Sequence, residues 1–345
     1  MDGSIALILV QDGVVNGAIY ALLALSLVLV FTVTRVIFIP QGEFVAYGAL
    51  TYAALDAGQL PGSLWLLAGL GLAAGAAGLW RQRGAWHAAA LLRLGLVTLL
   101  LPALVIGATL LLAPRKPGVA VEALLALAIV TPMAPYLYVV GFQQLADASV
   151  LVLLIAAVAA HLAMSGLGLL LFGPEGFGAT GFSAASLSLG GLDVPGQAIW
   201  IVGLTLGLMA ALYGFFGFTL RGSALRATAV NRLGARLVGI APAQSGAIAF
   251  TMAGAIGALC GILVVPLTTI TYDSGFLIGL KGFTAAIIGG LASYPAAAVA
   301  AVVLGIVESF ASFWASAFKE VIVFTAIIPF LLWRSWRNPP AEDEE

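Results

Sequence analysis

The sequence predicts an all-α integral membrane protein, a polytopic bundle of transmembrane helices. Of its 345 residues, 62% are hydrophobic and 8% are charged, about a third of the charged share of a soluble domain. So few charges cannot cover the surface of a water-soluble protein of this length, whereas lipid requires no such cover. The 42 glycines fit helices that pack closely in lipid through small residues.

A membrane-spanning helix needs about 20 mainly apolar residues. Charges, prolines and polar clusters divide the chain into eleven candidate segments, at residues 8–33, 41–57, 63–80, 91–113, 119–141, 148–172, 197–220, 243–265, 276–291, 295–313 and 318–334. The segments 41–57 and 276–291 are short and interrupted by glycine, so we expect broken or re-entrant helices there. Residues 1–345 are treated as a single transmembrane domain.

Arginine and lysine predict the orientation, because cytoplasmic loops retain these residues. The loop 221–242 contains four arginines and is therefore expected to be cytoplasmic. Alternation of the spans then places the polar tail 335–345 in the cytoplasm and the N-terminus outside. The segment 173–196 has no lysine or arginine and is expected to be external. Arg115 and Lys116 disagree with this scheme, because they fall in an expected external turn.

Several classes of function find no support in the sequence. A net charge of −1 offers no basic surface for nucleic acid. His87, His161 and the single cysteine, Cys260, have no ligand partners at helical spacing, so we expect no metal or cofactor. No G-x-x-x-x-G-K-[ST] motif and no recognisable Ser-His-acid arrangement occur, so the chain is not expected to be an enzyme or to hydrolyse ATP itself.

The loop 221–242 is also the most informative polar segment. Residues 226–233 could form two helical turns, whose extension Gly234 and Gly239 would limit. The small side chains of Ala227, Ala229 and Ala235 would let such a helix sit deep in the groove of a partner protein. An ordinary loop that keeps its arginines in the cytoplasm is the alternative.

Ionisable residues within apolar segments are costly in lipid unless they face protein or water. Glu43 lies where a membrane segment restarts after Pro40, so it either interacts with the helix dipole or lines a pathway. Lys281 could carry its ammonium to the interface along its long stem, or pair with Asp273. Asn16 and Glu308 are expected mainly to bond neighbouring helices.

The pattern R-x-x-x-x-R-A-x-A-x-N-x-x-x-A-x-L-x-G-I over residues 221–240 resembles the cytoplasmic coupling loop of branched-chain amino acid ABC permeases. Two other stretches resemble motifs of the same family. They are Asn16-Gly-Ala-Ile-Tyr20-Ala-Leu with Gln41-Gly42-Glu43-Phe, and Gly279-Leu-Lys281-Gly-Phe-Thr-Ala-Ala-Ile-Ile-Gly-Gly-Leu-Ala-Ser-Tyr-Pro295. Leu304-Gly-Ile-Val-Glu308 follows at the family's usual distance. The resemblance covers residues 12–60 and roughly 142–335.

The resemblance implies a permease subunit of an ABC importer in the inner membrane of a bacterium, with branched-chain amino acids or related small amino acids and amides as substrates. It implies as partners a second permease subunit in a heterodimer, two cytoplasmic ATPase subunits and an external substrate-binding protein. The ATPase-coupling residues would be Arg221, Arg226, Ala227, Asn231, Ala235 and Gly239. The translocation-pathway residues would be Asn16, Tyr20, Gly42, Glu43, Asp273 and Lys281.

The sequence departs from the family pattern at a few positions. Phe38, Ile39 and Pro40 stand where the family usually has Asn, Phe and Ala, and Ala296 replaces a usual Gly. The chain is also longer than the family core, which we interpret as an inserted helical hairpin within residues 61–141. A secondary transporter driven by an ion gradient is the alternative function, although acidic residues are sparse in the predicted spans.

Overall fold

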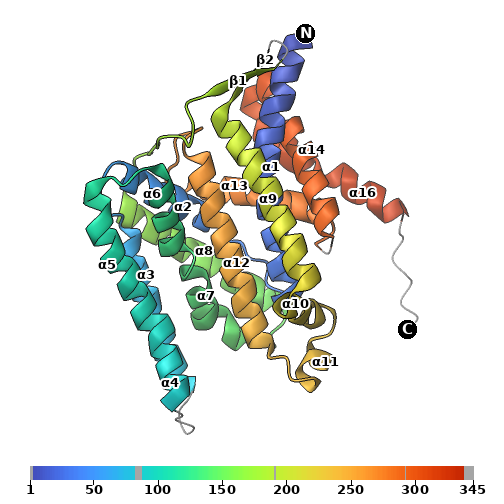
Figure 1. Cartoon of the computed structure of the whole chain (residues 1–345). Coiled ribbons are helices and arrows are strands. Elements are labelled where there is room, and N and C mark those ends of the chain that lie inside the picture. The colour runs from blue at the N-terminus through green and yellow to red at the C-terminus, as the bar shows by residue number, and fades with distance from the viewer. Residues whose placement is uncertain (1–2, 82–87, 190–191, 292, 338–345) are drawn as a thin grey trace.

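The structure, a computed structural model, describes residues 3–81, 88–189, 192–291 and 293–337. They form a bundle of helices and a two-stranded antiparallel sheet (Figure 1). The helices of the first half are α1 (Gly3–Thr34), α2 (Gln41–Asp56), α3 (Ser63–Arg81), α4 (Ala88–Gly95), α5 (Leu101–Leu112), α6 (Val119–Val130), α7 (Met133–Leu137) and α8 (Val150–Phe172). After β1 (Ser186–Leu189) and β2 (Leu192–Pro195) come α9 (Gly196–Phe218), α10 (Leu220–Val230), α11 (Arg232–Leu237), α12 (Pro242–Val264), α13 (Ser274–Ile288), α14 (Tyr294–Ala315), α15 (Lys319–Thr325) and α16 (Ile327–Arg337).

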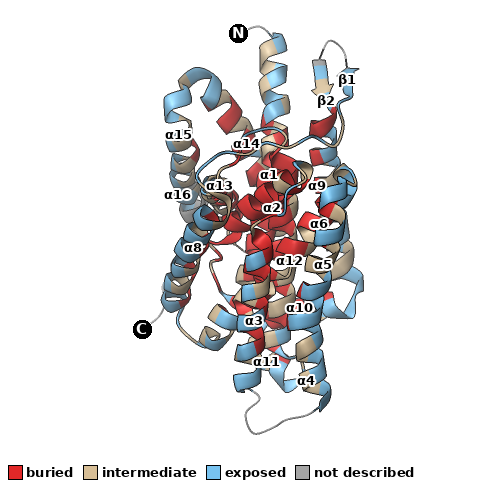
Figure 2. Ribbon diagram, turned by 90° about the vertical axis from the view of Figure 1, so that its left-hand side faces the viewer, coloured by how far each residue is buried: buried red, intermediate tan, exposed pale blue. Residues whose placement is uncertain are grey.

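Helix α1 forms the centre of the bundle. Its sequence is apolar on all sides, and from Gly17 to Val30 every residue is buried, as expected of a helix surrounded by protein. It packs against α14, α12 and α13. Figure 2 shows the buried residues gathered around α1, α2 and α12. The contact with α14 is a backbone contact, because a methyl group built on Gly305 would lie 2.3 Å from the carbonyl oxygen of Gly13.

Helices α2 and α13 are too short to cross a bilayer. Their 16 and 15 residues rise about 1.5 Å each, against a hydrocarbon core of about 30 Å. Each follows an irregular segment, at 35–40 and 265–273, and lies against α12 or α14 within the bundle. Non-helical backbone at membrane depth is tolerated only where protein or water surrounds it. The prediction of broken segments at 41–57 and 276–291 is therefore confirmed.

The outer helices carry the apolar surface that a bilayer would cover. Leu162 and Leu170 of α8 and Leu206 of α9 are 64%, 79% and 61% exposed, and Figure 2 shows α8 largely in the exposed colour. Eight helical stretches in the described part of the chain are long and apolar enough to cross a membrane. This confirms the predicted polytopic helical membrane protein.

The eleven predicted segments all coincide with helices, with differences in detail. The segment 119–141 is divided into α6 and α7 at Thr131 and Pro132. The last segment is broken, because α15 ends at Thr325 and α16 begins at Ile327. The expected external loop contains the β1–β2 hairpin, in which Leu187 pairs with Val194. Three spans occupy residues 63–145, and a hairpin insertion among them stays a prediction. Of the expected tail, 338–345 lies outside the described residues, as does His87.

The two ends of the bundle give a test of orientation. The N-terminus and the β1–β2 hairpin lie at one end, and α4, α10 and α11 lie at the other (Figures 1 and 2). In a Cys260→Ala background, Ser186→Cys in β1 is expected to react with an impermeant thiol reagent added to sealed cells, and Ser223→Cys in α10 is not. Both serines are exposed, so accessibility is matched. Labelling of Ser223→Cys from outside would contradict the predicted orientation.

Candidate functional site

The first candidate site is a cluster of buried charges that joins α1, α13 and α14. The Nζ atom of Lys281 lies 2.5 Å from Glu308 Oε1, and Tyr20 Oη donates a hydrogen bond to Glu308 Oε2 at 2.6 Å. Lys281, Glu308 and Tyr20 are at most 6% exposed. The Lys281 ammonium also lies 5.8 Å from the centre of the Tyr20 ring. Glu308 therefore uses both carboxylate oxygens to bind two other helices.

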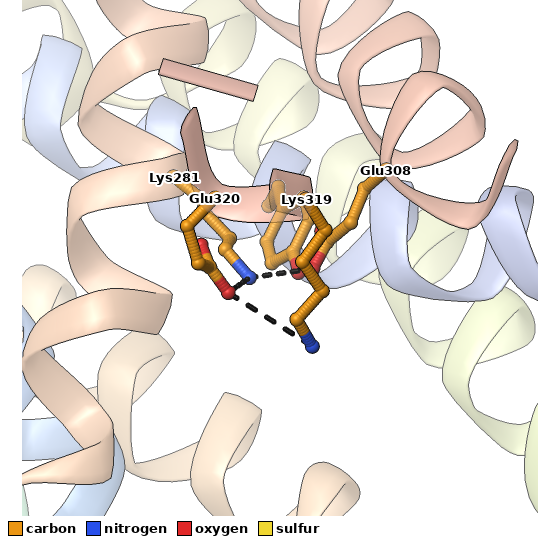
Figure 3. Close-up of polar contacts among 5 residues, drawn as sticks. Lys281, Glu308, Lys319 and Glu320 are labelled. Carbon is orange, nitrogen blue, oxygen red and sulfur yellow. Dashed lines mark hydrogen bonds and ion pairs between the residues drawn. The ribbon is translucent and has the colours of Figure 1, made fainter. Parts of the chain in front are cut away.

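The cluster continues outward to α15, as Figure 3 shows. Glu320 Oε1 lies 3.1 Å from Lys281 Nζ and 3.9 Å from Lys319 Nζ. The Glu320 and Lys319 side chains are 34% and 41% exposed, and Glu320 Oε2 has no hydrogen-bond partner among the described residues. Two ammonium groups thus face two carboxylates. Formal charge is balanced, as burial requires.

This geometry corrects two expectations for Lys281. Its ammonium does not extend into solvent, because the side chain is buried and held by two carboxylates. It does not pair with Asp273 either, because Asp273 is exposed and accepts a hydrogen bond from Thr271 Oγ1 at 2.5 Å in the turn before α13. The expectation that Glu308 bonds neighbouring helices is confirmed.

The second candidate site is a pair on α2 and α8. Glu43 Oε1 lies 2.8 Å from His161 Nδ1, and the Glu43 side chain is only 1% exposed. The His161 ring stacks on Phe276 of α13, with the ring centres 4.5 Å apart. Glu43 sits in the first turn of α2 but makes no side-chain capping bond there. Its hydrogen-bond partner is a histidine 118 residues away. Its place in the first turn of α2 is compatible with the predicted interaction with the helix dipole, which stays a prediction.

The N-terminal turns of α2 and α13 cross at glycine residues close to the second site. A methyl group built on Gly42 would lie 2.3 Å from Gly275 O, and one built on Gly279 would lie 2.7 Å from the Cα of Gly42. Only glycine permits this approach of two backbones. Because Glu43 follows Gly42, and Lys281 lies two residues after Gly279, the crossing links the two sites through short helices.

Asn16, another expected pathway residue, lies one helical turn before Tyr20 on α1 and is half-buried. Its side chain makes no hydrogen bond to any residue that the structure describes. The structure thus brings Tyr20 and Lys281 together at the first site. It places Gly42 and Glu43 at the second site, with Asp273 close enough for its charge to act on Glu43, and leaves Asn16 outside both.

The arginine-rich segment folds into two helices in place of the expected single pair of turns. Helix α10 starts after Thr219, whose hydroxyl accepts from Gly222 N at 3.0 Å. It ends at Asn231, whose side chain accepts from Gly234 N at 2.8 Å and so caps α11. Gly234 therefore lies within α11. Gly239 follows the helix at a φ of +83°, the left-handed conformation typical of glycine after a helix.

The small residues of this segment do not share one exposed face. Ala235 is buried, at 3% exposure, and Ala227 is half-buried, whereas Arg221, Arg226 and Asn231 are exposed. The expectation that Ala235 offers itself to a partner groove is therefore wrong. The exposed apolar side chains of this end are instead large: Val230, Leu233, Leu237 and Val238 are 88%, 69%, 82% and 74% exposed.

Two site residues, His161 and Glu320, were missed by sequence reasoning. His161 lies in an apolar helix and Glu320 near the predicted start of the last span. An ionisable residue in a membrane segment is by itself a signal of function. Both residues carried that signal, but Glu43 is 118 residues from His161 and Lys281 is 39 residues from Glu320.

Buried charges at the junction of short, broken helices are typical of solute paths in membrane proteins. Comparison with known proteins agrees. The family model described as "Branched-chain amino acid transport system / permease component" matches residues 9–332. The high-affinity branched-chain amino acid transport system permease protein LivH of Escherichia coli is 37% identical over 136 residues, which are 39% of this chain and 44% of LivH. The corresponding protein BraD of Pseudomonas aeruginosa is 32% identical over 148 residues, 42% of this chain and 48% of BraD.

Each of these matches spans less than half the length of the relative. No solved structure matches the chain.

Proposed function

The chain belongs to the family of branched-chain amino acid transport permease components, and on that premise we propose that it forms half of the membrane path of an ATP-driven importer. As a permease component it is a multi-pass membrane protein and not itself an enzyme. The observation that best supports the proposal is the convergence of the short helices α2 and α13 on two buried ionisable clusters. A path for an amino acid needs polar groups at membrane depth, and these clusters supply them.

The proposed cargo is a branched-chain amino acid or a related small amino acid or amide. Support comes from the family and from the apolar surroundings of the path. Phe38, which replaces a family asparagine, is fully buried and packs edge-on against Phe250 at 4.6 Å between ring centres. It offers no polar contact to a solute, so selectivity for the cargo would differ from relatives that keep the asparagine.

The proposed partners are a second permease subunit, two cytoplasmic ATPase subunits and an external substrate-binding protein. The α10–α11 segment would dock an ATPase, because it extends from the bundle (Figure 1) with large apolar side chains exposed beside its arginines. An ATPase that favours one of two states of the permease would bias the path through this contact. The docking surface would then be these apolar residues and not Ala235.

We expect Leu237→Asp to weaken ATPase association by roughly 30-fold, the equivalent of about 2 kcal/mol for a central interface residue. The measurement is the amount of ATPase that co-purifies with the tagged chain from native membranes. Leu187→Asp in β1, 50% exposed at the other end of the bundle, is the matched control and should retain the ATPase. Equal co-purification by both variants would contradict docking at α11.

An ion-gradient-driven transporter remains the second candidate. The Glu43–His161 pair favours it, because buried carboxylate–histidine pairs are the kind of group through which protons are relayed. The energy source separates the two candidates.

A further inference from the structure

The end of the bundle that carries α10 contains an apolar groove in addition to the two charged sites. The groove has a volume of about 690 Å³ and is bounded by the end of α1, the end of α9, α10 and the start of α14. It adjoins a second apolar cavity of about 360 Å³ that extends along α9 to Met209 and Leu212. The two share Phe216, Arg226 and Tyr294. They therefore adjoin at these three residues, one beside α10 and the other along α9.

The polar end of this space is basic. Arg35 and Arg226 line the groove, and among the described residues no aspartate or glutamate lines either cavity. A neighbouring polar pocket of about 450 Å³ shares Arg35 and adds Arg232 and Arg236, with Asp147 as its acidic residue. The positive charge at this end thus exceeds the negative charge around the groove.

The two groove arginines have almost no partners among the residues that the structure describes. Arg226 makes one long hydrogen bond, 3.5 Å to Ser223 Oγ, and the Arg35 side chain has no hydrogen bond or ion pair with any described residue. Arg35 also adopts a φ of +61°, which residues other than glycine rarely adopt. Two guanidinium groups therefore line the apolar space, with most of their hydrogen-bonding capacity unused by the described residues.

The space opens toward the surface that a bilayer would cover. Tyr213 lines the second apolar cavity and is 76% exposed. It lies on α9, a helix whose apolar side chains face outward. An apolar space that opens to lipid and has arginines at one end matches an anionic phospholipid. The apolar part would take an acyl chain, and the arginines would take the anionic head group. Basic pockets between transmembrane helices at the membrane surface bind such head groups.

We propose that this groove binds one anionic phospholipid, with its phosphate between Arg35 and Arg226 and an acyl chain along α9 past Phe216 to Leu212. The lipid would lie between α1, α9, α10 and α14, and so would hold α10 against the bundle. The proposal rests on the membrane location of the chain and not on its cargo or energy source. It can therefore fail while the transport function stands.

The test is native mass spectrometry of the complex purified from its membranes, delipidated and titrated with phosphatidylglycerol or phosphatidylcholine. Each guanidinium near an anionic lipid contributes about fivefold in affinity, so Arg35→Ala/Arg226→Ala should bind phosphatidylglycerol roughly 30-fold more weakly. Arg93→Ala, an exposed arginine on α4 at the same end of the bundle, should bind it as the unaltered protein does. Leu212→Trp fills the second apolar cavity without changing the charge of the protein, and it should also weaken the binding of phosphatidylglycerol.

Three outcomes would overturn the proposal. Equal retention of phosphatidylglycerol by the double variant and by Arg93→Ala would remove the arginines from the site. Equal affinity for phosphatidylcholine would show a surface without preference for anionic lipid. Displacement of the lipid by glycerol phosphate at equal concentration would show a site for a soluble anion, in which the apolar groove has no part.

Discussion

Replacing Lys281 by methionine is expected to lower the free energy of unfolding by about 3–5 kcal/mol and to abolish transport. The change leaves the Glu308 carboxylate, 6% exposed, without its closest charged partner. Removing one member of a buried ion pair is strongly destabilising, because the remaining charge stays desolvated. The measurements are the thermal unfolding midpoint of the purified protein and the uptake of leucine by cells.

Two variants serve as controls for this prediction. Lys319→Met removes the exposed ammonium that lies 3.9 Å from Glu320 and should change stability by less than about 1 kcal/mol. Lys281→Met/Glu308→Met replaces both buried charges and should recover much of the lost stability, because apolar pairs often substitute for buried ion pairs without loss. If the double variant also recovers transport, the charges serve packing alone. A single variant as stable as the unaltered protein would contradict the buried pair itself.

Gly305→Ala is expected to destabilise the bundle by about 1–3 kcal/mol or more, because overpacking displaces whole elements when the clash is with backbone. The added methyl group would lie 2.3 Å from Gly13 O and 2.5 Å from Gly17 N, both backbone atoms of α1. Separation of α1 and α14 would also stretch the Tyr20–Glu308 hydrogen bond, whose residues lie one turn farther along each helix. The measurement is again the unfolding midpoint, with leucine uptake alongside.

The matched control for this change is Gly207→Ala on α9, where a methyl group would meet no atom within 4 Å. That substitution should be neutral or slightly stabilising, because alanine favours the helix over glycine by up to about 1 kcal/mol. Equal effects of the two substitutions would mean that α1 and α14 do not pack through their backbones.

The positions of the helices could be predicted from the sequence because the bilayer imposes a simple rule on length and polarity. The short segments at 41–57 and 276–291 were recognisable for the same reason, since too few apolar residues separate their polar boundaries. The break between α15 and α16 was overlooked, although Pro329 in the first turn of α16 marks it, because proline has no N–H to donate to the carbonyl of Thr325. The β1–β2 hairpin was missed in a segment that is rich in glycine and serine.

The partners within the candidate site could not be predicted, because they are distant in sequence. Glu308 meets Tyr20 across 288 residues and Lys281 across 27, and helical spacing relates only residues within a few turns. Asp273 was the nearest acid to Lys281 along the chain, yet the turn at Thr271 holds it away. The burial of Ala235 depends in the same way on tertiary packing, which composition does not report.

The central claim is that the chain belongs to an importer driven by ATP, and the energy source of uptake tests it most directly. Radiolabelled leucine uptake is compared between cells that produce the chain and cells that lack it, first with a protonophore and then with arsenate, which depletes ATP while leaving the proton gradient. We expect the chain-dependent uptake to survive the protonophore and to stop with arsenate. Uptake that stops with the protonophore and continues with arsenate would contradict the claim and assign the Glu43–His161 pair to ion coupling.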